Sequence, residues 1–373
     1  MRANRNINSN GSKRDLRTEE HRTAGLLNIV VLVAIAAVAY TDWVVVANIS
    51  LGYLYILPIA LSALVNPLGF TAGLVVACTF LEDIFGPQPE SSHLRIGHIS
   101  ISLAGFLIVG FLVTLIAKQR DRLAAEIRRQ RDEYERDLVL ASHVQQRVLP
   151  KPLRLPTLEV AGAMRTARLL GGDYYDFFQI ADDLVDVVIA DVSGKGAAAS
   201  LLMPSLAVVL HLRARELSGP AAIIKDLDEA LKQITNSATF VTIFYARINS
   251  TTRTMEYTSG GHNPPLLVRP NTGQTMLLEE AGPIIGILPD AQFSNTVLTL
   301  EQGDILTLFT DGITEQENEH GNEFSLERLK EIVLNDETES ATALVAQIAE
   351  AVSVYAGGKE QADDLTVVAV KVL

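Results

Sequence analysis

The first third of the chain alternates long apolar runs with short polar stretches. Four apolar runs follow a polar and basic tail at residues 1–22: about 25–46, 51–66, 68–86 and 97–117. The first and last are long enough to cross the roughly 30 Å hydrocarbon core of a bilayer as helices. Four nearly consecutive runs with so few charges favour an all-α, four-helix transmembrane domain at residues 23–117 over buried helices of a soluble domain.

The charges that flank these runs predict an orientation in the membrane. Lys and Arg are frequent in the N-terminal tail and again directly after residue 117, whereas Asp42, Glu82, Asp83 and Glu90 occupy the loops between. An even number of spans with basic ends predicts a multi-pass membrane protein with both termini cytoplasmic. We interpret Glu82 and Asp83 as residues of the membrane interface, with ligand or proton binding as the alternative.

The segment at residues 118–150 predicts a helical linker. Residues 118–149 contain neither Gly nor Pro and are densely charged. A partial heptad seam runs through them: Leu123, Ile127, Tyr134, Ala141, Val144 and Val148. The seam favours a coiled coil and a parallel homodimer, with a lone helix lying on the next domain as the alternative. Pro150 and Pro152 end the helix, and a new domain begins at residue 151.

From residue 151 onward, short β-branched and aromatic runs replace the long apolar ones. Expected strands cover about 158–163, 174–180, 184–191, 239–248, 253–259, 265–269, 293–300, 304–310 and 365–372. Expected helices cover about 196–217, 220–235, 325–334 and 340–355. Strands arriving as hairpins and interrupted by paired helices predict an α+β sandwich for residues 151–373, and not an alternating βαβ sheet.

Charge and cysteine content exclude some functions. The net charge of −13 is concentrated in residues 151–373, which carry 16 Lys and Arg against 31 Asp and Glu. Such an acidic domain repels phosphate backbones, so we expect no nucleic-acid partner. The only cysteine, Cys78, lies in an apolar run, which leaves the acidic domain without a thiol nucleophile or a Cys-based zinc site.

Five aspartates stand where expected strands begin or end. They are Asp173, Asp191, Asp311, Asp363 and Asp364. Carboxylates brought together repel one another unless a cation neutralises them, and hard divalent cations prefer such oxygen ligands. Any one of them alone is by default a turn residue, so the prediction of a metal site depends on their combination and order.

Seven blocks carry a family resemblance: GGDYYDFF, IADVSGKG, FVTIFYARI, SGGHNPPLL, GPIIGI, LFTDGITE and ADDLTVVAV. In this order they resemble the bacterial metal-dependent (PPM-type) serine/threonine protein phosphatases of the stage II sporulation protein E type, over about residues 140–373. The resemblance implies an antiparallel β-sandwich of two sheets flanked by helix pairs. It also implies two Mn²⁺ or Mg²⁺ ions at one end of the sandwich.

The resemblance implies roles for individual residues. Asp191 matches the bridging metal ligand, helped by the Val192 carbonyl, and together with Asp311 it is the expected catalytic centre. Asp173 matches an acidic position that binds metal directly or through water. Asp363 and Asp364 include a further ligand, and the register of the pair leaves open which of them it is.

Three other residues have two interpretations each. Arg168 either binds the substrate phosphate or offsets nearby acids; the expected Pro-Ala before it is replaced by Thr166-Ala167. His262 is either a general acid or a structural hydrogen-bonding residue, and its turn-forming context favours the second. Asp176 fits the family's spacing and is equally compatible with a structural cap.

The expected function is hydrolysis of phosphoserine or phosphothreonine on a signalling protein by two-metal activation of water. The resemblance points to an anti-sigma-factor antagonist of the STAS type as the substrate, with activity controlled by the lipid-embedded domain. One alternative is a degenerate phosphatase that acts as a signalling scaffold. Another is a diguanylate cyclase, suggested superficially by Gly-Gly-Asp-Tyr-Tyr, although that motif falls too early in the domain.

Overall fold

A computed structural model describes most of the chain in two compact units. The described residues are 8–44, 51–85, 91–194, 197–235, 239–279 and 282–373. The units divide after Asp132, into Met1–Asp132 and Glu133–Leu373. Each unit is described by itself below.

The N-terminal unit is helical. Its elements are α1 (Asn8–Val44), η1 (Gly52–Tyr55), α2 (Ile56–Ala63), α3 (Leu68–Phe85) and the first part of α4 (Ser92–Val148). Three helices, α1, α3 and α4, are long and apolar enough to cross a membrane. The second apolar run forms only the short helices η1 and α2, below the roughly 20 residues that a span needs. The count of four spans therefore stays a prediction.

Two details of this unit were not predicted from the sequence. Helix α1 begins at Asn8, so it includes most of the polar tail. The side chain of Glu82 is only 5% exposed and is held among the helices, and its place at the membrane interface stays a prediction. The Glu82 side chain fits because Gly52 has no side chain: a Cβ there would lie 1.9 Å from Glu82 Oε1. Asp83 instead forms an ion pair with Arg95 at 2.6 Å.

The segment predicted to be a linker is helical in the structure. Helix α4 runs without interruption through the fourth apolar run and the linker, and ends at Val148. Leu123, Ile127, Tyr134 and Val144 of the heptad seam are all exposed in the single chain. An exposed seam is what a partner helix would cover.

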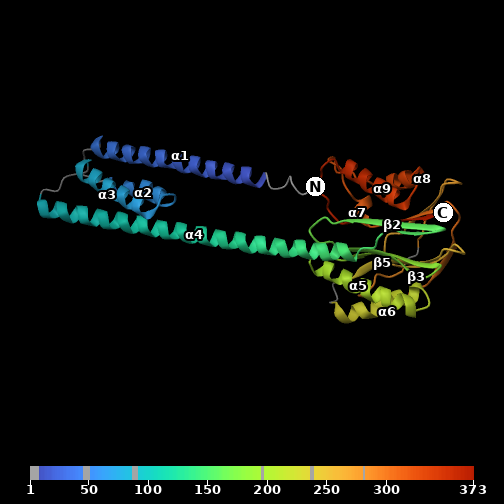
Figure 1. The fold of residues 1–373 in the computed structure, drawn as a ribbon. Helices are drawn as coiled ribbons and strands as arrows, with labels where there is room; N and C mark the ends of the chain where they lie inside the picture. The colour runs from blue at the N-terminus through green and yellow to red at the C-terminus, as the bar shows by residue number, and fades with distance from the viewer. Residues whose placement is uncertain (1–7, 45–50, 86–90, 195–196, 236–238, 280–281) are drawn as a thin grey trace. The chain divides into compact units, whose positions relative to one another are not determined.

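The C-terminal unit confirms the predicted sandwich of two antiparallel sheets (Figure 1). One sheet has the order β1 (Leu153–Leu155), β2 (Leu158–Arg165), β11 (Leu365–Val372), β10 (Ile305–Phe309), β7 (Leu266–Arg269) and β8 (Gln274–Leu277). The other has the order β3 (Asp173–Ala181), β4 (Leu184–Val192), β5 (Val241–Asn249), β6 (Thr254–Gly260) and β9 (Thr296–Thr299). The nine strands expected from sequence all form, and β1 and β8 add to them.

Helix pairs cover the outer faces of both sheets. Helices α5 (Ala197–Glu216) and α6 (Pro220–Ile234) pack on the β3–β9 sheet, and α8 (Leu326–Leu334) and α9 (Ala341–Ala356) pack on the other (Figure 1). A separate apolar core fills the space between the sheets, with Val187, Phe244 and Val368 fully buried in it. Both faces of each sheet are thus buried, which explains why β4 and β10 are apolar on almost every residue.

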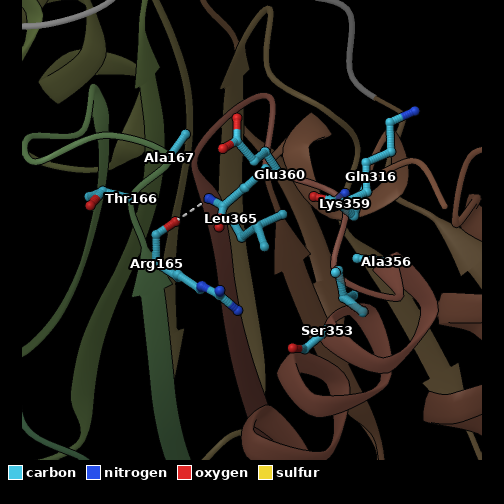
Figure 2. Close-up of a pocket in the computed structure, with 12 residues that line it drawn as sticks. Arg165, Thr166, Ala167, Gln316, Ser353, Ala356, Lys359, Glu360 and Leu365 are labelled. Carbon is cyan, nitrogen blue, oxygen red and sulfur yellow. Dashed lines mark hydrogen bonds between the residues drawn. The ribbon is translucent and has the colours of Figure 1, made fainter. Parts of the chain in front are cut away.

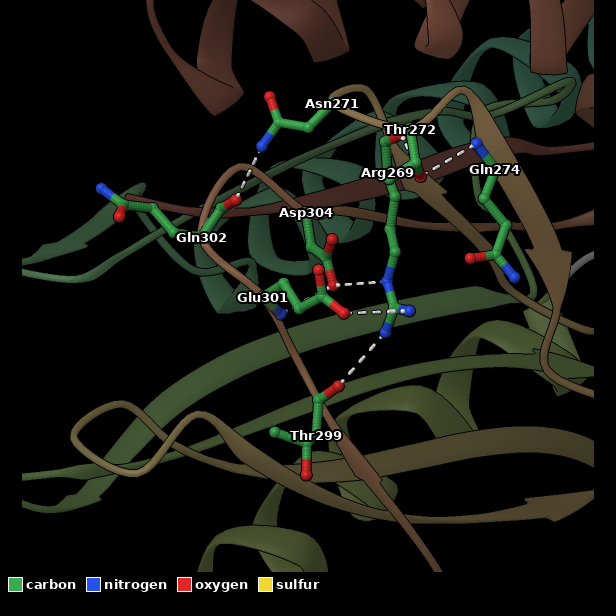
Figure 3. Close-up of polar contacts among 8 residues, drawn as sticks. All are labelled: Arg269, Asn271, Thr272, Gln274, Thr299, Glu301, Gln302 and Asp304. Carbon is green, nitrogen blue, oxygen red and sulfur yellow. Dashed lines mark hydrogen bonds and ion pairs between the residues drawn. The ribbon is translucent and has the colours of Figure 1, made fainter.

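An arginine fixes one end of the sandwich (Figure 3). Arg269, at the end of β7, forms ion pairs with Glu301 at 3.1 Å and with the buried Asp304 at 3.4 Å. Asp304 also accepts a hydrogen bond from the Glu301 N–H at 2.8 Å. These contacts hold the turn before β10, so β10 is anchored at the end opposite to Asp311.

Candidate active site

Asp173 and Asp191 lie directly opposite each other on neighbouring strands. Asp173 opens β3, Asp191 is the second-last residue of β4, and the antiparallel register pairs the two positions. Gly172, just before β3, allows the backbone to approach the end of β4, because a Cβ at Gly172 would lie 3.0 Å from the Val192 carbonyl oxygen. The strand pairing therefore brings together two carboxylates and the carbonyl for which the family resemblance implies metal binding.

Asp173 is buried, and its side chain is oriented by two threonines. Its Oδ2 accepts hydrogen bonds from Thr310 Oγ1 at 2.9 Å and Thr366 Oγ1 at 2.5 Å. Burial and the neighbouring Asp191 and Asp364 carboxylates raise the pKa of Asp173 well above its ordinary value, against the effect of these hydrogen bonds. A carboxylate in such surroundings is stabilised in its ionised form by a cation. Neither threonine could be recognised from the sequence, because the orienting of Asp173 depends on tertiary contacts.

Asp364 holds the loop that precedes β3. Its Oδ1 accepts a hydrogen bond from the Ala167 N–H at 2.8 Å, and its Oδ2 accepts one from the Gly172 N–H at 2.7 Å. Both oxygens of this buried carboxylate thus bind backbone amides. Asp363 is exposed instead, and its Oδ1 accepts a hydrogen bond from the Asp364 N–H at 2.9 Å.

Asp311 begins the short helix α7 (Asp311–Thr314) immediately after β10. A Cβ on the next residue, Gly312, would lie only 2.0 Å from the Asp364 carbonyl oxygen, so glycine is required for this approach. Burial and the nearby Asp311, Glu323 and Asp363 carboxylates raise the pKa of Glu315. Glu315 is therefore a further acid of this region, which sequence analysis did not single out.

A small cavity joins several of the predicted residues. It has a volume of about 20 Å³, and its lining includes Arg168, Asp191, Asp363 and Asp364. This is room for about one water molecule. Arg168 is positioned by a tight turn in which Thr166 Oγ1 donates a hydrogen bond to the Arg168 carbonyl at 2.6 Å. Thr166 therefore shapes the loop where the family pattern has proline.

The convergence of the acids fits a hard divalent cation, although it is looser than a closed metal site. Among the described residues, no three His, Cys, Asp or Glu side chains form a metal-ligand group. Mg²⁺ usually keeps several of its waters and needs only one or two carboxylates. The Asp173 environment and the oxygen-only donor set therefore fit such an ion, with Asp191 and Asp363 facing one cavity.

The structure favours a structural role for His262. A 2.9 Å hydrogen bond joins its Nδ1 to Thr242 Oγ1, and Thr242 lies opposite Asp191 on β5. Burial lowers the pKa of His262 to about 4, against the effect of the Phe309 backbone. The imidazole is therefore neutral at pH 7 and lacks the second ring proton that a histidine general acid donates.

The low pKa of His262 predicts a pH-dependent contribution to folding. Its folded pKa lies below the ordinary value of 6.5, so its contribution to stability is complete above pH 6.5 and is lost as the pH falls toward 4. We expect the difference in unfolding free energy between the native protein and His262→Asn to shrink by about 2 to 3 kcal/mol over that range. Urea unfolding at several pH values measures it, and parallel pH profiles would contradict the assignment.

Asp176 belongs to a structural network. Its Oδ2 accepts a hydrogen bond from the Tyr174 hydroxyl at 2.7 Å and lies 2.6 Å from His211 Nε2. Its Oδ1 accepts a hydrogen bond from the Phe177 N–H at 2.8 Å. These contacts tie β3 to α5, which supports the structural interpretation over metal binding.

Comparison with known proteins identifies the family. The model of the stage II sporulation protein E (SpoIIE) family matches residues 181–373. The chain belongs to the SpoIIE family. The Gly-Gly-Asp-Tyr-Tyr motif lies just before this match and leads into β3 of the same sandwich, which argues against a diguanylate cyclase.

Two curated relatives come from Bacillus subtilis (strain 168). Phosphoserine phosphatase RsbU is 30% identical over 190 residues, covering 51% of this chain and 56% of RsbU. Phosphoserine phosphatase RsbP is 28% identical over 183 residues, covering 48% of this chain and 45% of RsbP. The chain thus spans about half the length of these relatives.

Two solved structures confirm the fold. The SiaA-PP2C domain of Pseudomonas aeruginosa is 19% identical with a TM-score of 0.57, covering 65% of this chain and 98% of that domain. A SpoIIE structure from Bacillus subtilis, containing the PP2C phosphatase domain and a regulatory fragment, is 21% identical with a TM-score of 0.52; the match covers 60% of this chain and 64% of that one. The C-terminal half of this SpoIIE-family chain therefore has the PP2C fold.

Proposed function

We propose that this chain is a metal-dependent phosphatase that hydrolyses phosphoserine or phosphothreonine on a signalling protein. The observation that carries the proposal is the pairing of Asp173 with Asp191 beside a cavity that Asp363 and Arg168 also line. Two curated relatives are named phosphoserine phosphatases, which supports the same reaction. A STAS-type anti-sigma-factor antagonist as substrate extends the proposal on the family resemblance alone.

Each residue of the site has a part in the proposed reaction. Two Mn²⁺ or Mg²⁺ ions, when bound, supply an activated water and neutralise charge on the phosphoryl group. Asp191, Asp311, Asp363 and the Val192 carbonyl would hold these ions, with Asp173 binding directly or through water. Arg168 would bind the phosphate oxygens through its guanidinium group.

The surrounding residues position this machinery. Thr310 and Thr366 fix the orientation of Asp173, and Asp364 fixes the backbone at Ala167 and Gly172. The loop between them carries Arg168, so Asp364 sets where the phosphate-binding side chain lies. This assignment makes Asp363 the metal ligand of the pair and Asp364 its structural support.

A direct assay tests the proposal. The full chain in detergent micelles is given Mn²⁺ and either p-nitrophenyl phosphate or a phosphoserine protein, and phosphate release is measured. We expect release that stops when EDTA removes the metal and returns when Mn²⁺ or Mg²⁺ is added in excess. No metal-dependent release from either substrate would favour the catalytically degenerate scaffold.

We also propose that the membrane domain controls activity through helix α4. The chain would lie in the bacterial inner membrane, which the three helices long enough to span it support. Both termini would be cytoplasmic with the second apolar run as a fourth span, the even number that the basic flanks favour. The exposed heptad seam supports homodimerisation through residues 118–149, which light scattering of the full chain in detergent tests. A monomer would contradict the seam's proposed role.

The end of α4 reaches the loop of the site. Gln145 Nε2 donates a hydrogen bond to the Gly171 carbonyl at 2.7 Å, and the Gly171 N–H donates one to Gln145 Oε1 at 3.2 Å. The next residue, Gly172, is held by Asp364. A movement of α4 would therefore displace the loop that carries Arg168.

Replacing Gln145 with Ala is expected to lower phosphatase turnover about tenfold, the scale seen when a supporting contact around a metal site is lost. The matched control is Gln146→Ala, because Gln146 is the exposed neighbour on the same helix. Turnover by both variants is measured with saturating Mn²⁺. Equal turnover by the two variants would show that α4 does not support the loop.

A further inference from the structure

A second, larger cavity lies beside the site, between the end of β2 and the end of α9 (Figure 2). Its volume is about 470 Å³. The polar part of its lining comes from Arg165, Thr166, Gln316, Ser353, Lys359, Glu360 and Gln361. It is thus large enough for several side chains of a bound segment, and none of the residues assigned to metal binding lines it.

The positive charge in the cavity comes from Arg165 and Lys359, in a domain that is acidic overall. Arg165 extends its guanidinium group into the space between β2 and α9 (Figure 2). Its backbone is fixed, because the Arg165 carbonyl accepts a hydrogen bond from Gln361 Nε2 at 2.7 Å. Lys359 also lines the cavity and is paired with Glu317, while Glu360 contributes one negative charge. Arg165 is therefore the cation best placed to meet an incoming anion.

The two cavities are neighbours along one loop. Ala167 lines both of them, and Arg165 precedes Arg168 by three residues. An extended peptide advances about 3.3 Å per residue. A peptide whose phosphate lies at Arg168 would therefore place residues only a few positions away over Arg165.

We propose that this cavity binds an acidic segment of the phosphoprotein next to its phosphorylated residue, with Arg165 as the principal contact. The inference rests on the proposed phosphatase function and adds a substrate preference to it. Carboxylates of the substrate would pair with the Arg165 guanidinium, while the phosphate lies at the metal site. Small phosphate esters do not reach the cavity, so its effect should appear only with peptides.

The test compares two peptides and one small ester on the full chain with Mn²⁺ in detergent. One phosphoserine peptide carries Asp and Glu around the phosphoserine, and the other carries Ala at the same positions. We expect Arg165→Glu to raise KM for the acidic peptide about tenfold, with kcat unchanged, because a reversed charge repels where the native one attracted. KM for the Ala peptide and kcat/KM for p-nitrophenyl phosphate should change less than about twofold. A peptide with Lys at the flanking positions should be used better by Arg165→Glu than by the native protein.

Arg154→Glu in β1 is the control, because it makes the same charge change on an exposed residue outside the cavity. Equal effects of Arg165→Glu and Arg154→Glu would overturn the proposal, as would equal effects on both peptides. A third result would also overturn it: citrate inhibits the native protein, Arg165→Glu relieves this inhibition, and the KM for the peptides stays unchanged. The cavity would then hold a small free anion and not a peptide. Absence of p-nitrophenyl phosphate hydrolysis by the native protein would instead count against the phosphatase function itself.

Discussion

Replacing Asp191 with Asn is expected to lower kcat/KM for a phosphoserine substrate by about a thousandfold or more. Asp191 lines the small cavity and lies opposite Asp173, so its charge is central to any cation held there. A thousandfold loss corresponds to about 4 kcal/mol of transition-state stabilisation, within the several kcal/mol that metal ions supply. Steady-state kinetics with saturating Mn²⁺ measure the effect.

The same substitution should leave the fold intact. The Asp191 charge is one cause of the raised pKa of Asp173, so removing it relieves repulsion when no metal is bound. Thermal unfolding without metal should therefore occur at an equal or higher temperature. Asp182→Asn, in the exposed turn between β3 and β4, is the matched control and should retain full activity. Retention of more than a tenth of the activity by Asp191→Asn would refute its assignment as a ligand.

The second large effect separates the neighbours Asp363 and Asp364. Asp364→Ala removes the buried acceptor of two backbone hydrogen bonds. We therefore expect the free energy of unfolding to fall by about 2 to 4 kcal/mol. Asp363→Ala changes an exposed side chain, so the unfolding free energy should change by less than about 1 kcal/mol. Its effect should be on Mn²⁺ affinity, which we expect to fall at least tenfold.

Chemical unfolding without metal and Mn²⁺ titration of each variant measure the two effects. We expect the two variants to differ in which property they lose. Asp364→Ala loses stability, and Asp363→Ala loses metal affinity at nearly native stability. The reverse pattern would make Asp364 the ligand and Asp363 the support. Loss of stability in both variants would leave the assignment of the pair without support.

The sandwich was predictable because strand patterns are local. Runs such as Val187–Ala190 and Val367–Val370 are apolar on both faces, and strand positions follow from them. Asp191 follows the first run, and Asp364 comes just before the strand that holds the second. The short elements β1, β8 and α7 were missed, because three or four residues carry too little pattern. The second apolar run forms the short helices η1 and α2 within the described residues, and its crossing of a membrane stays a prediction.

The site was predictable in its residues and not in its contacts. Asp173 and Asp191 are recognisable at strand ends, but their direct opposition depends on the register of β3 and β4. The choice between Asp363 and Asp364 depends on hydrogen bonds to a loop nearly two hundred residues earlier. Thr310, Thr366, Glu315 and Gln145 were missed for the same reason, since their roles arise only when distant segments meet.

The most direct test of the account is anomalous diffraction from crystals of this protein soaked in Mn²⁺. We expect two Mn²⁺ peaks about 3.5 to 4 Å apart at the cavity that Asp191 and Asp363 line, with an Asp191 oxygen touching both ions and Asp311 and Asp363 each touching one. Peaks elsewhere on the domain would contradict it. So would Mn²⁺-soaked crystals in which these carboxylates point away from one another.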